Sequence, residues 1–96
     1  MYINWSPQRC DKTLLVSKVG DMVIVNGEEF DFGPLQEGDV LPLSAVGSEY
    51  FTSDISRVDG ELHIGLLLPH GPEASQAQLF PVLQHVTEEG EVTIPE

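Results

Sequence analysis

The chain has 96 residues, which fit one domain with a single modest core. Sixteen Asp and Glu residues against four Lys and Arg residues give a formal net charge of -12. Because binding to nucleic acids and anionic membranes depends on Lys and Arg, this charge excludes both as expected partners.

The first predicted element is a three-stranded meander over residues 13–32. Its strands meet at Gly20-Asp21 and at Asn26-Gly27, with apolar and β-branched residues on both sides. Asn-Gly supplies the positive φ values that a two-residue hairpin turn requires. The resulting register opposes Val23 to Phe30 and places the two phenylalanines of the third strand on the inner face.

A second hairpin is predicted around Asp59-Gly60, another dipeptide typical of a two-residue turn. Its register opposes Arg57 to Leu62. The second arm, residues 61–68, alternates apolar and other residues until Leu67 breaks the pattern, so we expect both faces of its end to be covered.

The remaining stretches are rich in Gly, Pro and small polar residues. Residues 33–53 are expected to be mostly loop, with one short helical turn at 43–46. Residues 73–96 are expected to form a loosely packed tail that begins with a mobile loop at 73–78. A last hairpin is expected to join residues 79–86 to residues 91–94.

These elements predict an all-β fold, namely antiparallel hairpins with at most one short helix, in a small sheet or sandwich. Residues 1–96 form a single domain in this interpretation, because the sequence has no internal repeat and no long helical periodicity. No basic-then-apolar leader and no stretch of ~20 apolar residues occurs. A soluble, cytoplasmic protein is therefore expected.

The sequence contains no catalytic, cofactor-binding or metal-binding motif. His63, His70 and His85 are spaced by seven and fifteen residues, which does not match a zinc motif, so we interpret them as unconnected surface histidines. Cys10 cannot form a disulfide within the chain and has no base beside it, which favours an unreactive thiol. We therefore expect no enzymatic activity, no cofactor and no metal.

An exposed edge strand is the best candidate for a contact with another protein. The segments Leu66-Leu67-Leu68 and Leu79-Phe80 are apolar enough to pair with a second chain. A protein partner, or a homo-oligomer formed through a β edge, is the expected result.

Three motifs resemble a family of small bacteriophage and prophage proteins, and the resemblance covers about residues 13–72. The motifs are Val25-Asn26-Gly27-Glu28-Glu29-Phe30-Asp31-Phe32, followed by Leu35, then Arg57-Val58-Asp59-Gly60-Glu61-Leu62-His63, and then Leu68-Pro69-His70-Gly71-Pro72. Such proteins are encoded near tail genes. The resemblance implies a context in tail assembly or in the virion, and no activity.

Two hypotheses of function follow. The first is a phage-derived, non-enzymatic tail accessory or assembly protein that acts by protein-protein contact, in the host cytoplasm or in association with the virion. The second is an acidic, host-directed inhibitor that competes for a nucleic-acid-binding surface, since its carboxylates are attracted to basic sites.

Overall fold

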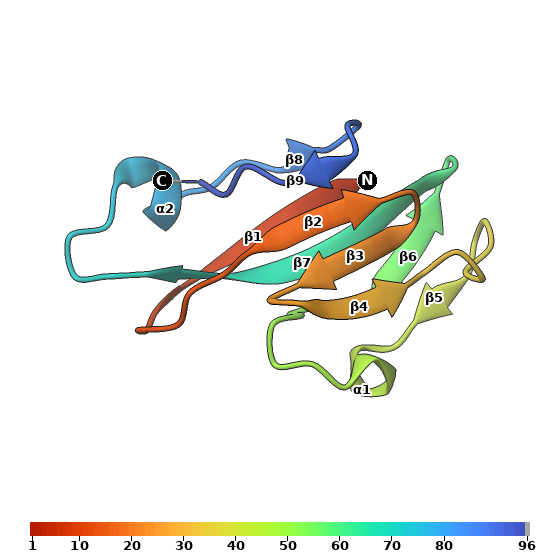
Figure 1. Ribbon diagram of the computed structural model, residues 1–96, viewed down its shortest axis with the longest axis horizontal. Helices are drawn as coiled ribbons and strands as arrows, with labels where there is room; N and C mark the ends of the chain where they lie inside the picture. The colour runs from red at the N-terminus through yellow and green to blue at the C-terminus, as the bar shows by residue number, and fades with distance from the viewer. Residues whose placement is uncertain (96) are drawn as a thin grey trace.

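The computed structural model describes residues 1–95 as two β-sheets that enclose one core, with two one-turn helices outside it (Figure 1). The five-stranded sheet has the order β5-β6-β7-β1-β8, and the four-stranded sheet has the order β4-β3-β2-β9. The strands are β1 (Tyr2–Arg9), β2 (Val16–Val19), β3 (Met22–Val25), β4 (Glu28–Asp31), β5 (Val40–Leu41), β6 (Ile55–Val58), β7 (Glu61–His70), β8 (Gln84–His85) and β9 (Gly90–Glu91), and the helices are α1 (Leu43–Val46) and α2 (Gln76–Leu79). The predicted all-β fold is confirmed.

The predicted meander forms the body of the four-stranded sheet, with β2, β3 and β4 in sequence. Val23 lies opposite Phe30, as its turn predicted. Asn26 and Gly27 both have positive φ values, 50° and 84°, which is the backbone twist that joins two strands most tightly. The Asn26 side chain also accepts a hydrogen bond from the Leu15 amide at 2.7 Å, so the turn holds the segment that precedes β2.

The second predicted hairpin is formed by β6 and β7. Arg57 lies opposite Leu62 and Ser56 lies opposite His63, in the predicted register. Helix α1 occupies residues 43–46 as expected, and it ends at Gly47 with a left-handed φ of 71°.

Strand β1 is the main element that the sequence analysis missed. It lies inside the five-stranded sheet and pairs in parallel with β7, from Tyr2 beside His63 to Arg9 beside His70. Ile3 and Trp5 face the core and are almost fully buried. The five-stranded sheet is therefore mixed rather than purely antiparallel. Parallel pairing is possible because the long chain segment between β1 and β7 supplies the crossover connection that parallel strands need.

The expected hairpin between residues 79–86 and 91–94 does not form. Instead, β8 pairs with β1 in one sheet and β9 pairs with β2 in the other. Val92 is buried and contributes to the core. Strand β8 is an edge of the five-stranded sheet and β9 is an edge of the four-stranded sheet. Each therefore pairs with a strand of its own sheet and not with the other.

Helix α2 begins within residues 73–78, where a mobile loop was expected. Ser75 caps it: the Ser75 hydroxyl accepts from the Gln78 amide at 3.2 Å, and the Ser75 amide donates to the Gln78 side chain at 3.1 Å. This reciprocal pair is a capping box, whose Ser-x-x-Gln signal was present in the sequence.

Arg57 joins the two sheets. It lies on β6 in the five-stranded sheet, and its Nε donates to the Leu35 carbonyl at 2.6 Å. Its Nη2 donates to the Phe32 carbonyl at 3.2 Å and to Asp21 Oδ2 at 3.1 Å, in the turn between β2 and β3. One guanidinium thus satisfies acceptors from three segments, which a planar fork of donors suits well.

We expect Arg57→Lys to lower the free energy of unfolding by about 1–3 kcal/mol, because an ammonium group cannot reach these separate acceptors and leaves partly buried carbonyls unpaired. Urea unfolding measures the change. Arg9→Lys is the matched control, because Arg9 is exposed at the end of β1. Equal stabilities of the two variants would contradict the joining role of Arg57.

Gly65 allows a loop to close over β7. A Cβ atom at residue 65 would lie 2.7 Å from Thr52 Oγ1 and still closer to Ser53 Oγ. The Thr52 hydroxyl also accepts from the Ser6 hydroxyl at 3.2 Å, so it is held in place from the β1 side.

We therefore expect Gly65→Ala to destabilise the fold by about 1–3 kcal/mol through overpacking. Gly71→Ala is the control, because a Cβ there meets nothing within 4 Å and the backbone is not left-handed. Thermal and urea unfolding of both variants would test this expectation, and a Gly65→Ala protein as stable as the control would contradict it.

Candidate functional site

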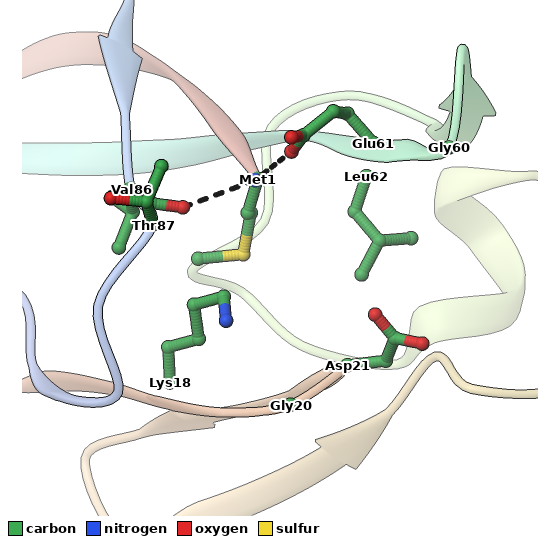
Figure 2. Close-up of a pocket in the computed structure, with 9 residues that line it drawn as sticks. All are labelled: Met1, Lys18, Gly20, Asp21, Gly60, Glu61, Leu62, Val86 and Thr87. Atoms are coloured by element: carbon green, nitrogen blue, oxygen red, sulfur yellow. Dashed lines mark hydrogen bonds and ion pairs between the residues drawn. The ribbon is translucent and has the colours of Figure 1, made fainter.

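A small polar cleft of about 200 Å³ lies between the sheets, where Met1 meets the turn between β2 and β3 (Figure 2). Four of the residues that line it bear charge: Met1 through its amine, Lys18, Asp21 and Glu61. The Met1 amine donates to Glu61 Oε2 and to the Val86 carbonyl, the latter at 3.1 Å.

The other charges of this cleft are also paired. Lys18 Nζ lies 3.6 Å from Glu89 Oε1, and Asp21 binds Arg57. Every charged group that lines the cleft thus has a partner among the described residues. The Asp21–Arg57 pair joins the two sheets, whereas the Met1–Glu61 pair connects β1 to β7 within one sheet. The described charges of the cleft are thus occupied by neighbouring groups of the chain.

Two of the three histidines form a stack with an aromatic residue, so the prediction that they are unconnected was wrong. The Tyr2 ring lies between His85, with centroids 4.2 Å apart, and His63, with centroids 4.9 Å apart. His85 Nε2 also lies 3.3 Å from Glu61 Oε1. The stack spans β8, β1 and β7, and no sequence signal linked these residues while β1 was missed.

His70 and Cys10 lie apart from this stack. His70 is at the end of β7, where its Nδ1 is 2.9 Å from the Gly71 carbonyl. Cys10 is half-buried and its amide donates to the His70 carbonyl at 3.2 Å. Within residues 1–95, no three His, Cys, Asp or Glu side chains come close enough together to hold a metal ion.

An apolar surface on and after α2 is the strongest candidate for a functional site. Four large hydrophobic side chains are exposed there: Leu79 (44%), Phe80 (74%), Val82 (80%) and Leu83 (57%). A fifth, Leu15 (65%), comes from the segment before β2 and lines a groove with residues 91–95. We call this set, together with the adjoining residues 93–95, the α2 surface. Large hydrophobic side chains that are exposed in a group mark contact sites more often than single ones do.

Two grooves are lined by four of these five side chains, namely Leu15, Phe80, Val82 and Leu83. One groove of about 440 Å³ is lined by Ala77, residues 80–84, Thr93 and Pro95. A second groove of about 600 Å³ is lined by Leu14, Leu15 and residues 91–95. Both grooves share Thr93 and Pro95, so the apolar side chains lie on either side of one C-terminal segment.

Gln84 holds the α2 surface to the sheets. Its Oε1 accepts from Trp5 Nε1 at 2.9 Å, and its Nε2 donates to the Thr93 carbonyl at 3.0 Å. Trp5 is in turn buried in the core. A buried side chain of β1 therefore supports both chain segments that border the first groove.

The predicted edge contacts are only partly in place. Leu66–Leu68 lies in β7 with β1 on one side and the segment of Tyr50 and Phe51 on the other, so the prediction of an exposed edge there was wrong. Leu79 and Phe80 are exposed, at the end of a helix rather than on an edge strand. The edge strand β4 bears Glu28, Glu29 and Asp31, and such charges discourage pairing with another chain.

Comparisons of the chain with family models, with curated proteins and with solved structures find no match. In the described part of the chain, no helix has the length and apolar character needed to cross a membrane.

The contacts of Glu61 generate a pH prediction. Its pKa is lowered from the ordinary 4.5, first by the hydrogen bond from the Met1 amine and then by that from His85. A lowered folded-state pKa stabilises the fold above the unfolded pKa and loses that contribution as the pH falls through the folded value. We expect Glu61→Gln to be less stable than the wild type near pH 7.

The difference between the two proteins is expected to shrink as the pH falls below about 4.5 and through the lowered pKa. Urea unfolding across this range measures it, with the exposed Glu28→Gln as the control for net charge. A difference that is constant with pH would contradict the ionic role of Glu61.

Proposed function

We propose that this chain is a phage- or prophage-derived, non-enzymatic accessory or assembly protein of the tail region, and that it acts by binding another protein. The observation that carries the proposal is the α2 surface. The three motifs that resemble the phage family support the context, and the surface supports the mode of action.

The energetics favour a contact role for the α2 surface. Its five exposed side chains present of the order of 600 Å² of apolar area, at the upper end of the largest patch on a typical monomer. Burying that area contributes roughly 15 kcal/mol at about 25 cal/mol per Å², before the cost of association. Since that cost is itself about 4–15 kcal/mol, a weak to moderate complex is expected.

The chemistry of the other candidate sites supports the same proposal. The charged groups of the polar cleft are all paired: Met1 with Glu61, Lys18 with Glu89, and Asp21 with Arg57. The histidine stack joins three strands through ring faces, a contact that stabilises a sheet. Protein-protein contact is therefore the function that the described residues support best.

The direct test uses the protein as bait, attached through a long flexible linker, in lysate of a bacterium that carries the phage tail genes. The salt concentration is set at about 0.15 M, so that contacts driven by charge alone are screened. We expect the wild type to capture tail proteins, identified by mass spectrometry. Phe80→Ser/Val82→Ser is expected to reduce the capture at least about tenfold, because it removes the two most exposed apolar side chains.

Val40→Ser/Val58→Ser is the matched control, because both valines are exposed but belong to β5 and β6. This variant is expected to capture tail proteins as well as the wild type does. Capture of a host DNA- or RNA-binding protein that is lost at high salt would favour the inhibitor hypothesis instead. Bait that recovers no tail protein would contradict the proposal.

A further inference from the structure

We propose that a second copy of this chain occupies the α2 surface, in a symmetric dimer that joins the two molecules at their α2 ends. The inference rests on the proposed function in that it concerns the same contact surface. A second copy and a tail protein would cover the same side chains, so the two contacts compete for this surface. It differs from pairing through a β edge, since the contact is made by side chains of α2 and of the segment that follows it.

The shape of the α2 surface suits a contact with itself. Phe80 and Val82 are the most exposed of its side chains, and they lie beside the groove of about 440 Å³ that residues 80–84 and Pro95 line. In a two-fold contact, each protruding residue of one copy meets the groove of the other, and the reverse holds by symmetry. Phe80 and Val82 of each copy can therefore fill the groove of the other copy.

The area of the α2 surface also agrees with a weak dimer. About 600 Å² from each copy gives about 1,200 Å² in total, at the lower limit for specific interfaces. Interfaces of this size reach moderate affinity only when they are well packed. We therefore expect a dissociation constant of the order of 10–100 μM.

The charge of the α2 surface permits the approach of an identical chain. Besides the two grooves described above, a third groove of about 350 Å³ is lined by residues 12–15, Pro69, Gln78, Ile94 and Pro95. Among the described residues that line the three grooves, the charged ones are Lys12 and Glu91, with opposite signs. The described residues of this surface thus offer a basic partner no excess of carboxylates. An identical copy meets one charge of each sign among them, so they do not oppose its approach.

One cluster of carboxylates lies at a distance from the α2 surface. Asp21, Glu37 and Asp39 gather around Arg57 and the Asp59-Gly60 turn. In Figure 1, α2 lies at the left end of the molecule and the loop before β5 lies at the right end, along the longest axis of 40 Å. The Debye length is about 8 Å at 0.15 M salt, so two copies joined at their α2 ends keep these clusters several screening lengths apart.

Sedimentation equilibrium of the untagged protein tests the inference, at concentrations from about 1 μM to about 1 mM in 0.15 M salt. We expect the average mass to rise from 10.5 kDa toward twice that value. Phe80→Ser and, separately, Leu83→Gln are expected to weaken the dimer at least about tenfold. Both side chains are exposed, so both variants should unfold at nearly the wild-type urea concentration.

Val58→Ser, which changes an exposed residue at the end of β6, is expected to dimerise as the wild type does. A monomer at about 1 mM would overturn the inference, and so would a dimer that persists in both α2-surface variants. This result is independent of the capture experiment. Bait at less than about 1 μM is monomeric whether or not the chain dimerises at higher concentration. Capture of tail proteins by a chain that never dimerises would leave the proposed function intact and reject this inference alone.

Discussion

Eight residue pairs hold β1 against β7 in parallel, from Tyr2 beside His63 to Arg9 beside His70, and much of the molecule depends on this ladder. It directs Ile3 and Trp5 into the core and offers β8 the other edge of β1. It also brings Tyr2 between two histidines. Without β1, Gln84 would lose its bond from Trp5, and the segments that form the α2 surface would lose their link to the sheets.

The molecule is polarised along its length. Around Arg57, an ion pair and hydrogen bonds join the two sheets. The Met1 amine with Glu61 connects the start of β1 to β7 within the five-stranded sheet. At the α2 end, apolar side chains are exposed and few charges line the grooves. This division lets an acidic chain repel other chains over most of its surface while it keeps one region suited to a protein contact. The proposed function and the proposed dimer are both consequences of that division.

Local signals predicted the hairpins well, because Asn26-Gly27 and Asp59-Gly60 adopt the positive φ values that set turn and register together. Strand β1 was missed because its main partner begins about sixty residues later and Pro7 interrupts its apolar alternation. Strands β8 and β9 have two residues each, too few for any pattern. The exposure of Phe80 and Val82 depends on where α2 ends and on how Gln84 is anchored. Both depend on tertiary contacts, which composition does not predict. Two signals were present but were given too little weight, namely the Ser75 capping box and the alternation of Ile3 and Trp5.

The central claim is that a well-ordered β1 supports an apolar surface that stays open to solvent. Amide hydrogen exchange along the chain, measured at about 1 μM to keep the protein monomeric, tests this claim most directly. The account predicts that the β1 amides bonded to β7 exchange among the slowest, with those of β3 and β7, and that the Val82 and Leu83 amides exchange fast. Fast exchange throughout β1, or exchange of the Val82 and Leu83 amides as slow as that of the core, would contradict it.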